Sequence, residues 1–164
     1  MPGRCSLFPL ATRRGNNLNE LPKTVVYGLR MQQFEFLIRG RPVSQQTRRR
    51  ERLKEWKDLV RKEAMSFWSP SHTAAEGPVC ITVVYLYEEA ALDVDNIIKP
   101  IQDALIGLAF PDDALVTDAI IRRRSLRGTF DLSDVSSVLI EGFEDGGEFV
   151  YVKVGDAPPQ EQLL

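Results

Sequence analysis

The stretch LDVDNIIKPIQDALIGLAFPDD, residues 92–113, combines clustered acids with an amphipathic pattern, and the interpretation of the whole chain starts from it. An apolar run at residues 79–87 precedes it and predicts a buried strand. Asp93 and Asp95 follow where this run ends, and a second acidic pair closes the stretch. Acids gathered by a strand end, a helix start and the next turn supply the oxygen ligands that Mg²⁺ prefers.

Between the two acidic groups, residues 97–108 have a helical pattern. The apolar side chains recur at spacings of three and four, which predicts one buried helix face. Asp95 or Asn96 is the candidate N-cap, because a short polar side chain there accepts a bond from a helix N–H. Gly107 predicts the end of the helix. Lys99 and Asp103 fall on the polar side, and we expect Lys99 to point back toward the first acids.

Two interpretations of these acids compete. In the first, they are a solvated loop and a helix N-terminus, where carboxylates suit the helix dipole. In the second, they form a metal-dependent active site. The whole pattern favours the second, because it joins D-x-D-N, a lysine four residues after the second acid, and Asp112-Asp113 ahead of another apolar strand.

These residues resemble the RusA family of Holliday-junction resolvases, which are small endonucleases often encoded by prophages. The resemblance rests on Asp93-Val-Asp95-Asn96, Lys99, Asp103-Ala-Leu and Asp112-Asp113, and extends to the loop at residues 40–44 and the arginines after it. It implies that Asp93, Asp95 and Asp113 bind Mg²⁺, with Mn²⁺ as a substitute, and that Lys99 assists catalysis. Asn96, Asp103 and Asp112 are then supporting residues.

The resemblance also implies a substrate and an assembly. The expected reaction is the resolution of four-way DNA junctions by paired symmetric nicks, in recombination and repair. The expected state is a homodimer, because one chain supplies one set of acids and two symmetric nicks need two sets. The resemblance implies a protein encoded by a bacterium or prophage. We expect it to be cytoplasmic, because no apolar run approaches the ~20 residues of a membrane span.

The charge distribution supports an anionic partner better than the net charge of −2 does. Residues 39–62 hold ten Lys or Arg against three acids, whereas residues 130–164 hold eight acids and one lysine. Such asymmetry predicts a basic face. The candidate DNA-binding residues are Arg41, Arg48, Arg49, Arg50, Arg52, Lys54, Arg122 and Arg124.

The remaining pattern predicts one α+β domain with a mixed sheet and helices packed against it. Residues 34–39 alternate as a strand, residues 52–68 carry a helical stripe that we expect Thr47 to cap, and residues 115–121 form a strand that the arginines follow. Residues 137–143 and 149–154 flank Glu-Asp-Gly-Gly, which predicts a hairpin. We expect the domain to span 31–154, between an irregular N-terminal extension (1–30) and a disordered acidic tail (155–164).

Two other functions remain open. One is a nucleic-acid-binding module whose acids are structural. The other is a haloacid-dehalogenase-like phosphatase, which also places D-x-D after an apolar strand but needs distal acids much farther downstream. Nucleophilic schemes that require histidine depend on His72 alone, which we interpret as an exposed loop residue.

Overall fold

The computed structural model describes residues 31–89, 92–159 and 161–162 and contains one four-stranded mixed sheet. The strand order is β1-β4-β2-β3, and the bounds are β1 (Phe34–Arg39), β4 (Phe149–Asp156), β2 (Val79–Tyr87) and β3 (Val116–Ser125). Strand β4 runs antiparallel to both neighbours, whereas β2 and β3 are parallel. The expected α+β fold with a mixed sheet is confirmed.

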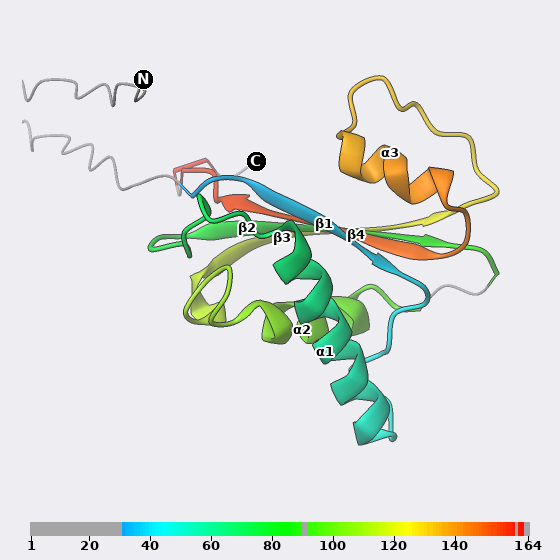
Figure 1. The fold of residues 1–164 in the computed structure, drawn as a ribbon, viewed down its shortest axis with the longest axis horizontal. Helices are drawn as coiled ribbons and strands as arrows, with labels where there is room; N and C mark the ends of the chain where they lie inside the picture. The colour runs from blue at the N-terminus through cyan, green and yellow to red at the C-terminus, as the bar shows by residue number, and fades with distance from the viewer. Residues whose placement is uncertain (1–30, 90–91, 160, 163–164) are drawn as a thin grey trace, which may run out of the picture.

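Three helices cover the two faces of this sheet. Helices α1 (Arg50–Phe67) and α2 (Asp95–Leu105) lie together on one face, and α3 (Ser137–Glu144) lies on the other (Figure 1). Helix α2 is the crossover between the parallel strands β2 and β3, and a short 3₁₀ turn, η1 (Asp113–Leu115), leads into β3. The acidic stretch therefore lies within a β–α–β unit.

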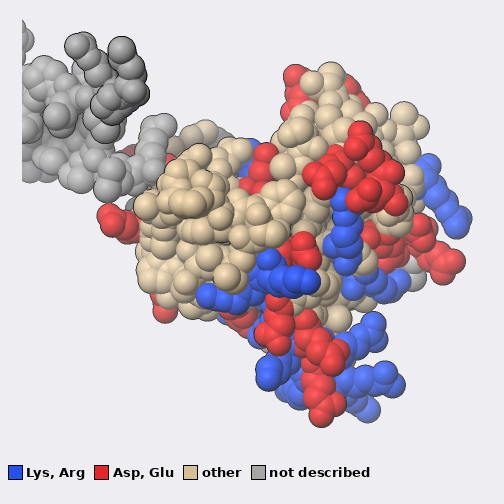
Figure 2. Space-filling model, in the orientation of Figure 1, with Lys and Arg blue, Asp and Glu red and all other residues tan. Residues whose placement is uncertain are grey.

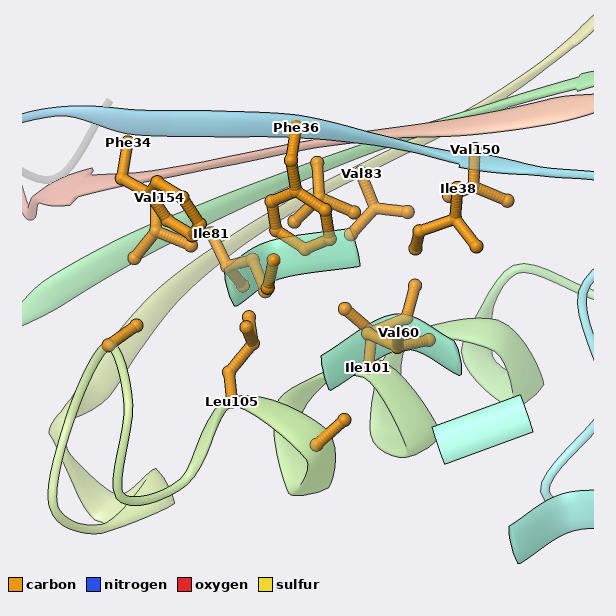
Figure 3. Packing of buried hydrophobic residues seen from close by; sticks show 14 of the residues in the cluster. Phe34, Phe36, Ile38, Val60, Ile81, Val83, Ile101, Leu105, Val150 and Val154 are labelled. Carbon is orange, nitrogen blue, oxygen red and sulfur yellow. The ribbon is translucent and has the colours of Figure 1, made fainter. Parts of the chain in front are cut away.

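The larger core lies between the sheet and the pair α1–α2. Phe36 and Ile81 from the sheet and Val60 and Leu105 from the helices are fully buried there (Figure 3). In α1 the buried residues are Leu53, Trp56, Val60 and Ala64, which follow the predicted helical stripe. At about 25 cal/mol per Å² of apolar surface, such a face stabilises the helix far more than its capping does.

Capping at the start of α1 differs from the prediction. The helix begins at Arg50 after Arg49, and no side chain caps it. Thr47 Oγ1 instead accepts a hydrogen bond from the Arg49 N–H in the preceding turn, at 3.4 Å.

The predicted hairpin before β4 is wrong, because residues 137–144 form α3. The Ser136 hydroxyl caps this helix by accepting a bond from the Leu139 N–H at 3.3 Å. Val138, Leu139 and Phe143 pack on the second face of the sheet against buried Phe149. A short apolar run does not distinguish a strand from a helix by itself, and here the uncovered sheet face favoured a helix.

Both ends of the domain are joined to the sheet. Strand β4 continues to Asp156, two residues beyond the predicted boundary, and Asp156 Oδ1 accepts a bond from the Met31 N–H at 2.9 Å. The Ala157 N–H donates to the Pro78 carbonyl at 2.9 Å. Residues 155–157 are thus part of the fold rather than of a tail. The predicted extension, residues 1–30, lies outside the described residues.

Among the helices of the described ranges, none combines the length and hydropathy that crossing a bilayer requires.

The packing of α3 depends on Gly142. A methyl group added there would lie 2.4 Å from Phe149 Cε2, and the Phe149 ring is fully buried. We expect Gly142→Ala to lower the free energy of unfolding by about 1–3 kcal/mol, as overpacking does, despite the better helix propensity of alanine. Gly77→Ala is the matched control, because no atom lies within 4 Å of its added methyl group. Thermal unfolding measures both variants, and an unchanged Tm for Gly142→Ala would contradict this packing.

Candidate active site

The first two acids lie in the connection from β2 to α2. Helix α2 begins at Asp95 itself, and Val94 occupies the N-cap position with no side-chain cap. The prediction that Asp95 or Asn96 caps the helix is therefore wrong. Both acids are exposed, with the Asp93 side chain 79% accessible. Since neither carboxylate is used for capping, both can face an external ligand.

Lys99 joins the polar side of α2 to the second acidic pair. Its ammonium group contacts Asp113 Oδ2 and, at 2.9 Å, Asp103 Oδ1. The side chain therefore points toward Asp103 and Asp113. The prediction that it points back toward Asp93 and Asp95 is wrong. Hydrogen bonds to Asp113 and then to Asp103 raise the pKa of Lys99 above its ordinary value. The ammonium is thus held in its charged form beside Asp113.

The Asp112-Asp113 pair divides its tasks. Asp112 Oδ1 accepts a hydrogen bond from the Ala114 N–H at 2.8 Å and so caps η1. This bond fixes the short turn before β3 and leaves Asp113 to meet Lys99. Asp112 therefore has a structural role, whereas the Asp113 carboxylate contacts the Lys99 ammonium.

The arginines near residue 122 lie within β3, not after it, and they alternate between faces of the sheet. Arg123 lies on the α1–α2 side, where its Nη1 is 3.7 Å from Asp93 Oδ1 and 3.3 Å from the Leu92 carbonyl oxygen. Arg122 lies on the α3 side, in a cavity with Thr82 and Leu139. By the same alternation Arg124 shares the face of Arg122.

Arg123 is the site residue that sequence reasoning missed. The predicted DNA-binding pair, Arg122 and Arg124, points to the face opposite the acids, and Arg123 alone of the three contacts them. A strand pattern extended through Ser125 would have revealed this, because side chains two apart share a face.

A groove of about 280 Å³ connects the predicted basic residues with the acidic stretch. Arg41 from the loop after β1, Arg52 from the first turn of α1, and Leu92 beside Asp93 all line it. The loop is held against α2 by a bond from the Gln45 N–H to the Asn96 carbonyl, at 2.9 Å. Ser44, Gln46 and Thr47 add polar groups to the groove. Cations and hydrogen-bond donors thus converge next to Asp93, which suits a phosphate group.

The other basic candidates lie where α1 projects from the body of the molecule. Arg48, Arg49, Arg50 and Lys54 are all exposed. Figure 2 shows Lys and Arg side chains on both sides of an acidic column at this projecting end. No ion pair within 4 Å engages these four residues in the described part of the chain, so they remain available to an anionic partner.

The acids suit Mg²⁺ by their chemistry, but the structure does not gather them into a metal site. In the described ranges, no group of three or more Asp, Glu, His or Cys lies close enough to hold a metal ion. Asp93 faces Arg123 and Asp113 faces Lys99 instead. The metal-binding role of Asp93, Asp95 and Asp113 stays a prediction.

His72 is half-buried and not the exposed loop residue predicted from the sequence. Its Nδ1 accepts a bond from the Ser69 N–H at 2.8 Å, and its ring packs against Phe34 and Trp68. These contacts give His72 a structural role.

Comparison with known protein families agrees with the geometry. The family model for endodeoxyribonuclease RusA matches residues 33–130, which run from the start of β1 past the end of β3. That range includes the groove and every acid of the stretch from Asp93 to Asp113. A comparison with curated proteins gives no significant match. Because the matched range covers more than half of the chain, the protein belongs to the RusA endodeoxyribonuclease family.

Proposed function

We propose that this protein is a Mg²⁺-dependent, structure-specific DNA endonuclease that resolves four-way junctions by paired symmetric nicks in recombination and repair. The groove that joins Arg41 and Arg52 to Leu92 carries this proposal, because it brings phosphate-binding cations next to Asp93. Membership of an endodeoxyribonuclease family supports the same reaction class.

DNA binding is assigned to two neighbouring surfaces. The groove supplies Arg41 and Arg52, and the projecting start of α1 supplies Arg48, Arg49, Arg50 and Lys54. Arginine and lysine at such a surface contact phosphates and fix the register of the DNA without reading its sequence. We add Arg123 to this set, because it lies on the face of the acids, and we withdraw Arg122 and Arg124 from direct contact at the same site.

For the chemistry, we assign metal binding to Asp93, Asp95 and Asp113, with Mn²⁺ as a substitute for Mg²⁺. A bound divalent ion lowers the pKa of its water and offsets charge on a phosphoryl oxygen. Lys99 holds a full positive charge in contact with Asp113, and a preorganised cation stabilises charge that develops on phosphate oxygens. Arg123 offers a second cation beside Asp93.

The other functions have less support. A haloacid-dehalogenase-like phosphatase needs a larger parallel sheet. Here β4 runs antiparallel to both β1 and β2, and β2 and β3 form the one parallel pair of the described sheet. A binding module with structural acids fits Asp112, which caps η1, but not Asp93 and Asp95, which cap nothing. Metal-dependent nicking of branched DNA separates a nuclease from a binding module, and hydrolysis of small phosphate esters would favour the phosphatase.

We also propose that the active form is a homodimer, since two symmetric nicks need two sites. Neither β4 nor the Trp56 face of α1 offers such an interface, because both are largely buried within the chain. Strand β3 is an edge of the sheet and exposes Ile120 by 42%. Antiparallel pairing of two β3 strands about Ile120 would set Asp118 opposite Arg122 of the second copy, and opposite charges across strands are stabilising. An unpaired edge also favours such pairing.

The acids are tested by single substitutions to asparagine. We expect Asp93→Asn, Asp95→Asn and Asp113→Asn each to slow junction cleavage by more than about 100-fold, because even an outer-shell partner of a metal contributes 10- to 100-fold. Junction binding should persist, since the change removes negative charge. Asp134→Asn, in the exposed loop before α3, is the control and should cut normally. Full activity in Asp95→Asn would contradict the assignment.

The basic surface is tested by salt dependence. Replacing Arg48, Arg49 and Arg50 with alanine should weaken junction binding and flatten the plot of log K against log salt. Each lost phosphate contact should reduce the slope by about 0.9. The measurement is a titration of labelled junction at several salt concentrations. An unchanged slope would move the DNA path away from the start of α1.

The dimer is tested by sedimentation equilibrium at micromolar concentration. The wild-type chain should sediment as a dimer, and Ile120→Lys should shift it toward monomer with little change in Tm, because Ile120 is already exposed. Met65→Lys is the control, since Met65 on α1 is 57% exposed and lies away from β3. A dimer unaffected by Ile120→Lys would exclude β3 as the interface, and a monomer that still makes paired nicks would refute the dimer.

A further inference from the structure

Lys57 and Asp103 form a contact for which the proposed chemistry has no role. Asp103 divides its carboxylate between two lysines on different helices: Oδ2 accepts from Lys57 Nζ of α1 at 2.6 Å, and Oδ1 lies 2.9 Å from Lys99 Nζ of α2. We propose that Asp103 and Lys57 are positioning residues that hold Lys99 at the active site, and that they connect it rigidly to the DNA-binding helix α1. This inference rests on the proposed function.

The first argument concerns the mobility of Lys99. Its side chain is 44% exposed, and a lysine held in one rotamer at such a position loses much of its conformational freedom. Contact with Asp113 alone would not fix it during a reaction in which Asp113 has another task. Asp103 supplies a second contact from the same helix face, four residues away. Lys99 therefore has an anchor that does not depend on Asp113.

The second argument concerns charge. Partial burial acts to raise the pKa of Asp103, but hydrogen bonds from Lys57 and Lys99 outweigh it, so that the pKa lies below its ordinary value. Asp103 is only 23% exposed and Lys57 29%. With one lysine alone, Asp103 would neutralise the charge of Lys99. With Lys57 also bound, Lys57, Asp103 and Lys99 carry a net charge of +1, so Asp103 does not cancel the charge that Lys99 offers to Asp113 and to a phosphate.

The third argument concerns the docking of α1. One turn after Lys57, Arg61 Nη1 donates to the Ala104 carbonyl at 3.0 Å and to the Ile106 carbonyl at 2.9 Å. These are carbonyls at the C-terminal end of α2, which lack partners within the helix. Lys57 and Arg61 thus fasten α1 to α2 by three polar contacts. Since α1 begins with the arginines assigned to DNA, phosphates bound there are fixed relative to Lys99.

A purely structural role for the pair makes a different prediction. If Lys57 and Asp103 only joined two helices, their loss would lower the Tm and leave the cleavage rate of the folded enzyme unchanged. If they position Lys99, their loss lowers the rate at saturating DNA and Mg²⁺, with the affinity for the junction nearly unchanged. The division between kcat and KM therefore separates the two roles.

The experiment compares Asp103→Asn, Lys57→Met and Lys57→Arg by single-turnover cleavage of a four-way junction. We expect the first two to cut about 10- to 100-fold more slowly, as loss of outer partners in active sites does. Lys57→Arg should restore most of the rate, because it keeps the charge. Lys153→Met is the matched control: it removes the same charge on the opposite face of the sheet and should cut at the wild-type rate. Tm and junction affinity are recorded for every variant.

A second measurement reads Lys99 directly. In wild-type protein labelled with ¹⁵N, the Lys99 ammonium should give a protected side-chain signal, and Asp103→Asn should weaken or shift it while Lys153→Met should not. A wild-type rate in Asp103→Asn, or an unchanged Lys99 signal, would overturn the inference and leave the nuclease assignment intact. A wild-type protein that cuts no branched DNA would instead refute the proposed function itself.

Discussion

The parallel pairing of β2 with β3 is the constraint on which the rest of the structure depends. Parallel neighbours cannot be joined by a tight turn, so the chain must cross over through α2. The crossover places Asp93 and Asp95 after β2 and Asp113 before β3, and it brings Arg123 near the carboxyl end of β3 beside Asp93. The amphipathic face of α2 then buries Ile97, Ile101 and Leu105 on the sheet, which directs Lys99 and Asp103 outward. The parallel pairing thus determines both which face of α2 is buried and where these charged residues lie.

The acids of the site are balanced by cations from separate elements. Asp93 faces Arg123 from β3, Asp113 faces Lys99 from α2, and Asp103 is shared with Lys57 from α1. Partly exposed ion pairs of this kind contribute little stability each, typically below about 1 kcal/mol. Their arrangement therefore matters more for the local field than for folding. Because Asp93, Asp103 and Asp113 each have a nearby cation, this surface repels a polyanion less than the acids alone would.

Sequence reasoning located the elements that have a strong period and missed those that tertiary contacts decide. The sequence correctly predicted the buried stripe of α1, the helix after Asp95 and the buried strand β2, because the spacing of apolar residues follows their burial. Helix α3 was mistaken for a strand, because eight residues carry too little periodicity and only the sheet face beneath Phe143 decides the outcome. Arg123 was missed because β3 extends four residues beyond the apolar run, into the arginines themselves. The partner of Lys99 depended on how the loop after α2 folds back, which no local pattern reports.

Acids and cations are distributed unequally over the two faces of the sheet, and this distribution explains how a protein with a net negative charge has a basic surface. The eight acids after residue 129 are carried largely by α3, its flanking loops and β4, whereas the cations of α1 lie on the other face. On the α3 face, burial and then the hydrogen bond to Glu35 raise the pKa of Tyr151 to about 12. Tyr151 is therefore a neutral donor in the wall of the cavity that it shares with Arg122. Interactions between exposed charges are screened beyond about 8 Å at physiological salt. Since the sheet and its side chains are thicker than that, the acids behind it hardly reduce the attraction of an anion to the α1 face. Glu148 is the exception, because its Oε1 lies 3.8 Å from Arg41 Nη1 in the groove. The net charge of −2 therefore understates what the groove and the start of α1 present to a phosphate backbone.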